Sequence, residues 1–270
     1  MAITGLSGCA TLAGSFNPVA RTDLIAAKNG FVKAEVPTSR FLLMTYSKIG
    51  SPGKPLTVYL EGDGLAWLSK NKLSGDPTPL HPLVFSLASM DLSPNVLYLA
   101  RPCQYVSDSK CNPDYWSDKR YSEEVIGSMN EAIDTFMRKS NSVKIRLLGY
   151  SGAAAVALLI AERRQDVSSL RTIAGNLNPE AVNRYHEASP LTGSLDPLQQ
   201  VSKIADLPQI HYVGAADKVI PPFIAQDFIK NFPNSSCVRV NVVPNVTHST
   251  GWEEHWHALF SERVPCEVKD

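Results

Sequence analysis

The chain has 270 residues, of which 44% are hydrophobic, and its 26 basic and 26 acidic residues give a formal net charge of zero. This length and composition suit one large α/β domain with an ample core. A neutral chain gives no electrostatic reason to expect binding to nucleic acid or to an anionic membrane surface, and no apolar run is long enough to span a bilayer. We therefore expect an N-terminal segment over residues 1–30 and a single domain over residues 31–270.

The N-terminal segment contains a match to a bacterial lipobox. Residues 6–9 read Leu-Ser-Gly-Cys, which makes Cys9 the expected lipidation site and a route to membrane anchorage. Only eight residues precede Cys9, without Lys or Arg and with too short an apolar stretch for an export signal. Three explanations stay open: a start further upstream, a truncated chain, or a chance match.

Strand and helix patterns alternate along the rest of the chain. Runs rich in β-branched and aliphatic residues predict strands, and these lie near residues 31–36, 40–47, 56–61, 95–100, 143–148, 169–174, 209–214 and 237–243. Segments with helical character lie near residues 80–91, 120–139, 152–165, 222–232 and 252–263. Elements in this order imply right-handed crossovers and a mostly parallel, eight-stranded sheet flanked by helices.

A glycine-rich loop follows the strand at 56–61 and reads Glu-Gly-Asp-Gly at residues 61–64. Such a loop can offer a backbone N–H group to a substrate oxygen, and we expect Asp63 to supply it together with Gly152. Glu61 comes directly after a buried strand. We interpret it as a structural acid that anchors the loop by hydrogen bonds, in preference to a catalytic general acid.

The strand at 95–100 ends in Arg-Pro-Cys-Gln-Tyr at residues 101–105. Parallel topology places this end beside the glycine-rich loop, where Arg101 can pair with Glu61 or Asp63; the alternative is a solvated arginine. Four cysteines pair off as Cys103–Cys111 and Cys237–Cys266. Two disulfides in a chain with a lipobox favour an oxidising compartment, the bacterial cell envelope or periplasm, whereas free buried thiols would suit the cytoplasm.

The most informative segment is residues 143–154, where a buried strand turns into a helix around Ser151. The turn reads Gly-Tyr-Ser-Gly-Ala at residues 149–153, with Ala153 at the place where this motif usually has its second glycine. Small neighbours allow the sharp strand-to-helix turn that holds a nucleophilic serine clear of the sheet. The helix N-terminus favours the negative charge that develops there.

A base and an orienting acid complete this pattern further along the chain. Asp217 lies in the loop after the strand at 209–214, and His248 lies in the loop after the last strand. The rival acids Asp196 and Asp206 do not directly follow a strand. In an open parallel sheet the carboxyl ends of the strands share one edge, so Ser151, Asp217 and His248 are expected to meet there as catalytic residues.

Several further residues are expected near this edge. Substrate pocket residues are assigned from the adjoining loops: Gly62, Gly64, Trp67, Tyr150 and Trp252. The aromatic residues among them, like Tyr105 and Trp116, can instead be core packing. His255 and His257 lie two apart on a helix and face different directions, so no metal site is expected.

These motifs resemble the α/β-hydrolase superfamily and, within it, a small bacterial esterase or lipase-like group. The resemblance covers about residues 31–264 and implies the α/β-hydrolase fold with a minimal cap, formed by the short segment over residues 176–207. It implies a serine hydrolase that cleaves small-molecule or lipid esters through an acyl-enzyme, without a cofactor. A thioesterase or peptidase using the same triad, and a non-catalytic binding protein on this scaffold, are the alternatives.

Overall fold

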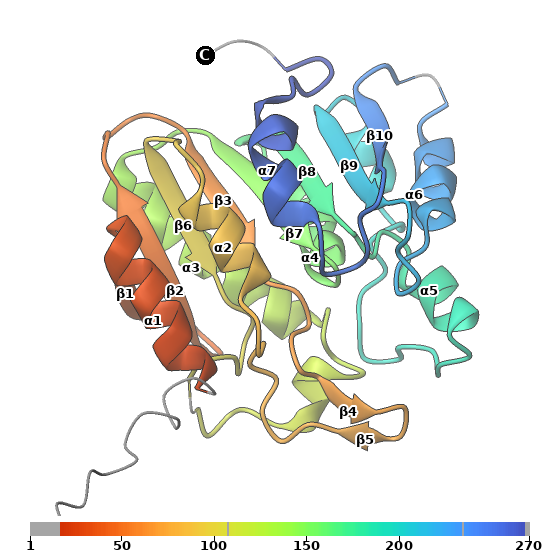
Figure 1. The fold of residues 1–270 in the computed structure, drawn as a ribbon, viewed down its shortest axis with the longest axis horizontal. Coiled ribbons are helices and arrows are strands. Elements are labelled where there is room, and N and C mark those ends of the chain that lie inside the picture. Colours follow the sequence, from red (N-terminus) through yellow and green to blue (C-terminus); the bar gives the residue numbers. More distant parts are fainter. Residues whose placement is uncertain (1–16, 107, 234, 268–270) are drawn as a thin grey trace, which may run out of the picture.

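The computed structural model describes residues 17–106, 108–233 and 235–267, and its centre is one eight-stranded sheet (Figure 1). The strand order is β1-β2-β6-β3-β7-β8-β9-β10. The β1–β2 and β2–β6 pairs are antiparallel, and all other neighbours in this sheet are parallel. The bounds of its strands are β1 Val32–Pro37, β2 Leu42–Ile49, β3 Leu56–Leu60, β6 Asn95–Leu99, β7 Ile145–Tyr150, β8 Val167–Ile173, β9 Gln209–Gly214 and β10 Val238–Val243.

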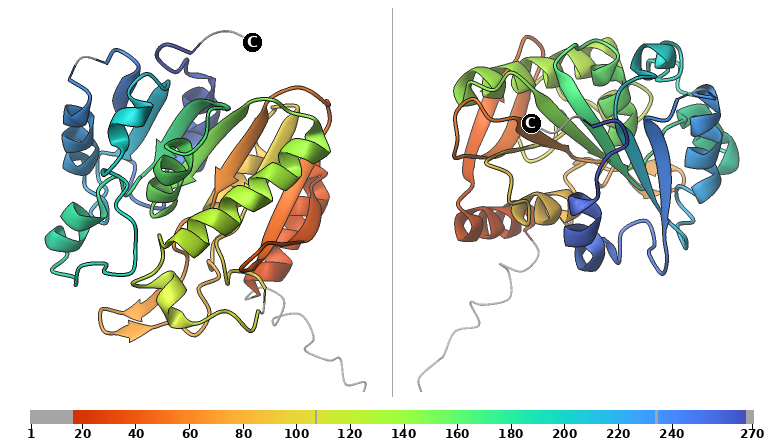
Figure 2. Two further views of the ribbon diagram at one scale, coloured as in Figure 1. Left: turned by 180° about the vertical axis from the view of Figure 1, so that it is seen from behind. Right: turned by 90° about the horizontal axis from the view of Figure 1, so that it is seen from above.

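Helices cover both faces of this sheet, as the view from above shows (Figure 2). One face carries α1, α2 and α7, and the other carries α3, α4 and α6. The helix bounds are α1 Pro18–Asn29, α2 Leu83–Ser89, α3 Glu123–Ser140, α4 Ala153–Ala161, α5 Pro179–Tyr185, α6 Pro222–Phe228 and α7 Trp252–Ser261. Because both faces are covered, every residue of β3, β6 and β9 is buried. None of the described helices is long and apolar enough to cross a bilayer.

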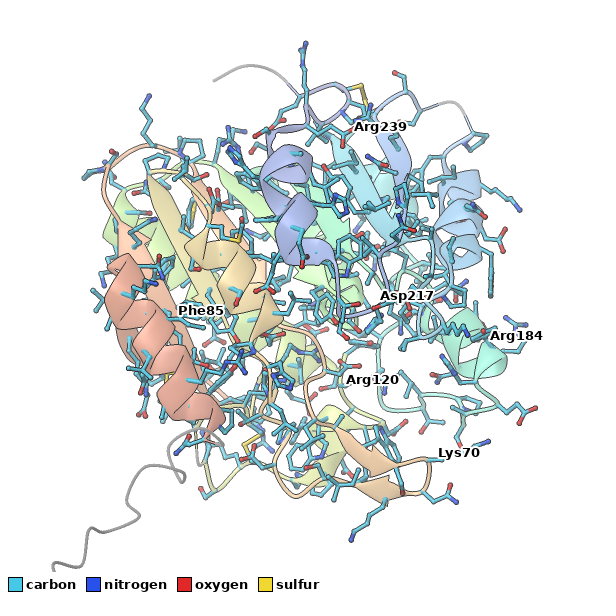
Figure 3. All side chains as sticks on the ribbon, in the orientation of Figure 1. Lys70, Phe85, Arg120, Arg184, Asp217 and Arg239 are labelled. Carbon is cyan, nitrogen blue, oxygen red and sulfur yellow. A yellow bond between two sulfur atoms is a disulfide. The ribbon has the colours of Figure 1, made fainter. Side chains whose placement is uncertain are left out.

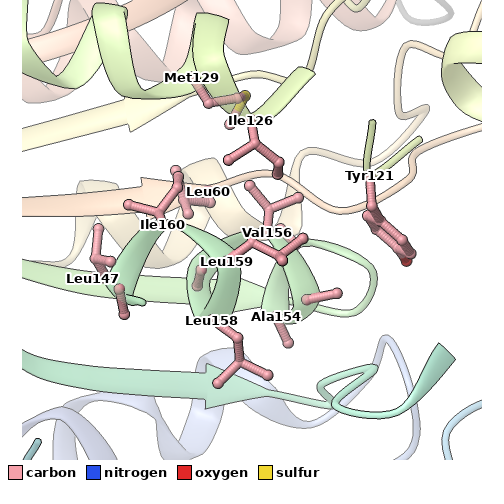
Figure 4. Packing of buried hydrophobic residues seen from close by; sticks show 14 of the residues in the cluster. Leu60, Tyr121, Ile126, Met129, Leu147, Ala154, Val156, Leu158, Leu159 and Ile160 are labelled. Carbon is pink, nitrogen blue, oxygen red and sulfur yellow. The ribbon is translucent and has the colours of Figure 1, made fainter. Parts of the chain in front are cut away.

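The larger core cluster lies on the face covered by α3 and α4. All nine residues of α4 are buried, as expected for a helix that is apolar all round. Figure 4 shows Ile126 of α3 beside Val156 and Ile160 of α4. This packing anchors the helix that begins two residues after Ser151, so the position of that residue depends on a rigid part of the core.

The predicted fold class is confirmed, but three elements were not predicted. Helix α1 lies inside the segment expected to precede the domain, and it packs on α2 and β1. The Asn17 side chain caps its start, Gly30 ends it with a φ of 72°, and Asp23 accepts a hydrogen bond from the Tyr46 hydroxyl. Residues 18–29 are therefore part of the folded domain.

The other two unpredicted elements border the sheet edge where the parallel strands end. A hairpin of β4 Trp67–Ser69 and β5 Lys72–Leu73 follows β3, and α5 lies in the segment expected to form a small cap. Helix α2 begins at Leu83, a little later than expected, because Pro79 and Pro82 precede it. The remaining short helical turns are 3₁₀ helices: Pro113–Trp116, Val201–Ile204 and Ile229–Asn231.

Candidate active site

Ser151 occupies a strained turn between β7 and α4. Its φ is 51°, a left-handed conformation that is uncommon for a residue with a side chain. A Cβ atom at Gly149 would lie 2.4 Å from the Ala153 carbonyl oxygen, so only glycine fits where the strand and helix come closest. The Ser151 N–H group donates to the Ile173 carbonyl of β8 at 3.0 Å. The turn is thus held by the sheet and leaves the hydroxyl exposed to the cavity.

Three side chains from three separate loops form one hydrogen-bonded chain at this edge. His248 Nε2 lies 3.0 Å from Ser151 Oγ, and His248 Nδ1 lies 2.9 Å from Asp217 Oδ2. Because a carboxylate only accepts, Nδ1 carries the proton and Nε2 is left to accept from the serine. The three residues that the strand-end argument selected are therefore brought together, each beyond the carboxyl end of its strand.

Asp217 is held rigidly as the carboxylate of this chain. Its side chain has no solvent exposure, and its Oδ1 accepts hydrogen bonds from the backbone N–H groups of Val219 and Ile220 at 2.8 and 2.9 Å. With Oδ2 bound to His248, both oxygens have partners. Such bonds fix the orientation of the carboxylate. Figure 3 shows Asp217 and Arg120 at the same edge of the sheet.

The backbone of His248 is clamped by two aromatic side chains. The Tyr150 hydroxyl and Trp252 Nε1 both donate to the His248 carbonyl oxygen, at 3.1 and 2.9 Å. Burial raises the pKa of Tyr150, so its hydroxyl stays a donor. The expectation that Trp252 lines the pocket is corrected here: the side chain is fully buried, and it contacts the back of the histidine loop.

Asp63 and Gly152 lie in contact beside Ser151. A Cβ atom at Gly152 would lie 2.1 Å from Asp63 Oδ1, so the carboxylate occupies the space that a larger residue would need. Neither backbone N–H group donates a hydrogen bond within the described part of the chain. Two arginines hold the carboxylate, with Arg101 Nη1 at 3.1 Å and Arg120 Nε at 3.7 Å. Of the two partners considered for Arg101, the ion pair is made with Asp63.

Glu61 is a buried carboxyl group that anchors the same loop. Its Oε1 accepts from the Gly62 N–H group at 2.9 Å, and its Oε2 accepts from the Tyr98 hydroxyl at 2.8 Å. Burial raises the pKa of Glu61 to about 7, although these two bonds and Arg101 favour the ionised form. Its interpretation as a structural acid agrees with these contacts. It also lies on the wall of the cavity next to Ser151.

A cavity of about 550 Å³ opens at Ser151 and His248. Gly64 and Tyr150 line it as expected, and Asp63, which was predicted for the oxyanion site, lines it too. Gly62 does not, because its backbone is covered by the Tyr150 ring. Trp67 also lies elsewhere: it is 45% exposed on β4 and lines a separate groove of about 1000 Å³.

One whole wall of this cavity was not predicted from the sequence. It is formed by the segment before and at the start of α2, together with α1 and α7, and its members include Arg21, Pro79, Leu80, His81, Leu83 and Glu253. The clustered prolines of residues 77–82 indicated irregular chain near the edge of the sheet, but nothing in their spacing pointed to the site.

The remaining candidates lie outside this constellation. Asp196 caps a turn through the Leu198 N–H group, and Tyr105 and Trp116 are buried packing residues. His255 and His257 are exposed on α7, and the described residues contain no cluster of three or more His, Cys, Asp or Glu side chains suited to a metal ion. The Asp206 side chain likewise does not line the cavity.

The two expected disulfides are present. Cys103 is bonded to Cys111 and Cys237 to Cys266, with Cα atoms 5.6 and 5.0 Å apart. The first closes a loop that contains Gln104 and follows Arg101 by two residues, and Gln104 Nε2 donates to the Gly62 carbonyl oxygen at 3.0 Å. By constraining the segment that holds Gln104, this disulfide helps to fix the position of the glycine-rich loop. Cys9 lies outside the described residues.

Comparison with known proteins identifies the fold. No family model matches the sequence, and no curated protein does. Among solved structures, Est1E from Butyrivibrio proteoclasticus is 13% identical with a TM-score of 0.58, covering 84% of this chain and 95% of its own. The Pyrococcus furiosus esterase Pf2001 is 12% identical with a TM-score of 0.64 over 87% and 92%. The Pyrococcus horikoshii acylaminoacyl peptidase is 11% identical with a TM-score of 0.63 over 89% and 42%. The strand order and these likenesses agree: the chain has the α/β-hydrolase fold.

Proposed function

We propose that the protein is a serine hydrolase that cleaves carboxylic esters through an acyl-enzyme. The observation that carries this proposal is the unbroken chain of hydrogen bonds from Ser151 through His248 to Asp217, at 3.0 and 2.9 Å. A serine, a neutral imidazole and a buried carboxylate at these distances are the parts that nucleophilic acyl transfer requires. The same distances argue against a non-catalytic binding protein with a misaligned site.

Each residue has one role in the proposed reaction. Ser151 Oγ attacks the ester carbonyl carbon while His248 Nε2 takes its proton, and the proton then passes to the departing alcohol. Water attacks the resulting acyl-enzyme with His248 as base, and the acid leaves from Ser151. Asp217 keeps the imidazole in the correct tautomer and stabilises its charged form.

The oxyanion is the group that needs most stabilisation in this sequence of steps. We assign this role to the N–H groups of Asp63 and Gly152, which have no other acceptor in the described part of the chain. Ser151 has a strained backbone, and Gly152 is the N-cap residue that directly precedes α4, so its N–H group lies at a helix N-terminus. Arg101 and Arg120 neutralise the Asp63 carboxylate and so remove a charge that would oppose the oxyanion.

An ester substrate is supported by the structures that this chain resembles, because esterases and a putative dienelactone hydrolase are among them. Acylaminoacyl peptidases are also among them, and the fold alone does not select a leaving group. The test is a panel of p-nitrophenyl esters, acyl thioesters and peptide amides with the same acyl group. The proposal predicts the highest kcat/KM for esters. A higher value for thioesters or amides would replace it with the corresponding alternative.

We further propose that the protein works in the bacterial cell envelope or periplasm. The two disulfides support this location, and acylation of Cys9 would anchor the protein at a membrane. Metabolic labelling with a palmitate analogue tests the anchor: label lost in Cys9→Ala supports it, and label retained or never incorporated argues against it.

A further inference from the structure

The catalytic cavity extends well beyond the reacting serine. It begins at Ser151, passes the loop after β3, and reaches α1 and the start of α2, which lie side by side over the antiparallel end of the sheet (Figure 1). Strand β3 lies between β7 and β6. Because neighbouring strands are about 5 Å apart, β7 and β6 are separated by roughly 10 Å along the edge of the sheet. A substrate that fills the cavity therefore has a part about this far from its ester carbonyl.

Two polar side chains meet at the α1 end of the cavity. Arg21 Nη1 lies 3.0 Å from His81 Nδ1, and both residues line the cavity. A guanidinium group has donors only, so Nδ1 of the neutral ring must accept and Nε2 must carry the proton. Arg21 and His81 consequently both present N–H donors, and one of them is always positively charged. Two donors with one positive charge are suited to a carboxylate or phosphate group.

Arg21 has no acidic partner within ion-pair distance among the described residues, whereas Arg101 and Arg120 both have one. Three acids line the same cavity. Asp63 is paired with Arg101 and Arg120. Glu61 is at the β3 part of the wall, where Gly62 and Tyr98 occupy its oxygens. Glu253 is exposed in the first turn of α7, where water screens its charge.

The wall between the two ends is largely apolar. Its side chains come from Leu65, Pro79, Leu80, Pro82 and Leu83. We propose that this cavity selects esters that carry an anionic group separated from the ester carbonyl by an apolar spacer, and that Arg21 with His81 binds that anionic group. This inference rests on the proposed function, since it names the substrate class of the same site.

The kinetic test compares esters that differ only in terminal charge. One arm places the charge on the acyl side, with p-nitrophenyl half-esters of succinate, adipate and suberate against neutral p-nitrophenyl esters of the same chain length. The other arm places it on the alcohol side, with 4-acetoxybenzoate against its neutral methyl ester. In at least one arm we expect the wild-type protein to prefer the anionic substrate, and the arm that shows this identifies the side of the ester that faces Arg21.

Variants assign that preference to the proposed residues. Arg21→Gln should lower the ratio of kcat/KM for the anionic over the neutral ester by roughly tenfold, because one charge-assisted hydrogen bond is lost. Arg21→Lys should keep part of this ratio, and Glu253→Gln should raise the ratio only slightly, because water already screens the charge of Glu253. Arg138→Gln, on α3 at the opposite face of the sheet, is the matched control. A ratio that is the same in wild type and Arg21→Gln in both arms would overturn the proposal.

A binding measurement separates this inference from the proposed function. Calorimetry with the Ser151→Ala variant compares monomethyl adipate with methyl hexanoate, and repeats both with Arg21→Gln added. Tighter binding of the anionic ester that disappears with Arg21→Gln supports the inference even if no ester is hydrolysed. Equal binding of the two esters overturns it even if the wild-type protein proves to be an active esterase.

Discussion

Arg101 Nη1 lies 3.1 Å from Asp63 Oδ1, and the Asp63 carboxylate in turn packs against the backbone of Gly152. The Arg101 side chain is only 5% exposed, and it also donates to the Arg120 carbonyl oxygen. This ion pair therefore connects the loop after β6 with the loop after β3 and with the first residue after the serine. It fixes the two backbone N–H groups that we assign to the oxyanion.

Arg101→Ala is expected to lower kcat for a model ester by roughly tenfold or more, with a smaller effect on KM, because the transition state depends on these N–H groups. The free energy of unfolding should also fall by about 3 kcal/mol, since Asp63 is left as a poorly compensated charge. Arg101→Lys keeps the charge and should restore part of both. Steady-state kinetics and thermal unfolding are the measurements. An unchanged kcat together with an unchanged Tm would show that the ion pair has no such role.

Gly152→Ala tests the contact between the carboxylate and the turn. The new Cβ atom would lie 2.1 Å from Asp63 Oδ1, so the loop after β3 must move. We expect kcat to fall on the order of 10²-fold, comparable to the loss of one oxyanion donor. Gly75→Ala is the control, because a Cβ atom there meets nothing within 4 Å. If both variants keep wild-type kcat, Asp63 does not sit against Gly152 as described.

The buried acid Glu61 predicts a pH dependence of stability. Its pKa is raised from 4.5 to about 7 by burial, so between these values the folded protein holds a proton that the unfolded chain has lost. Stability therefore falls as the pH rises through this window, by at most about 3 kcal/mol from this group. Relative to Glu61→Gln, the wild-type free energy of unfolding should decline from pH 4.5 to 7 and be level above that. A difference between the two proteins that stays constant or rises with pH would contradict the assignment.

The two disulfides are expected to differ in what they support. Replacing Cys237 and Cys266 by serine opens a loop of 29 residues and should lower the free energy of unfolding by about 3 kcal/mol, with little change in kcat. Replacing Cys103 and Cys111 should lower kcat as well, because Gln104 in that loop binds the Gly62 carbonyl. Denaturant unfolding and ester kinetics on the two double variants distinguish them. Equal kcat in both would remove the proposed link between the first disulfide and the site.

The parts of the site that follow strand ends could be predicted from the sequence. Ser151, Asp217 and His248 each lie one short loop beyond a strand with an apolar pattern, and parallel topology brings such loops to one edge. The same reasoning placed Asp63 and Arg101 on that edge. The predicted cysteine pairs agree with the structure for a related reason, since each joins a strand end to a nearby loop.

Residues whose position depends on packing could not be predicted in this way. Helix α1 buries few residues, among them Thr22 and Ala26, so its sequence lacks an apolar stripe, and Arg21 gave no sign of reaching the cavity. Trp252 follows the loop that carries His248 and was therefore predicted to line the pocket, but the packing of α7 against the sheet turns its indole into the core. Trp67 lies on a short exposed hairpin whose direction the strand pattern does not determine.

The central claim is that Ser151 is the nucleophile, activated by His248. The most direct measurement is labelling with a fluorophosphonate probe, followed by digestion and mass spectrometry to locate the modified residue. We expect a single adduct on Ser151, no labelling of Ser151→Ala, strongly slowed labelling of His248→Ala, and normal labelling of the exposed-serine control Ser261→Ala. Labelling that persists in Ser151→Ala, or an adduct mapped to another residue, would contradict the account.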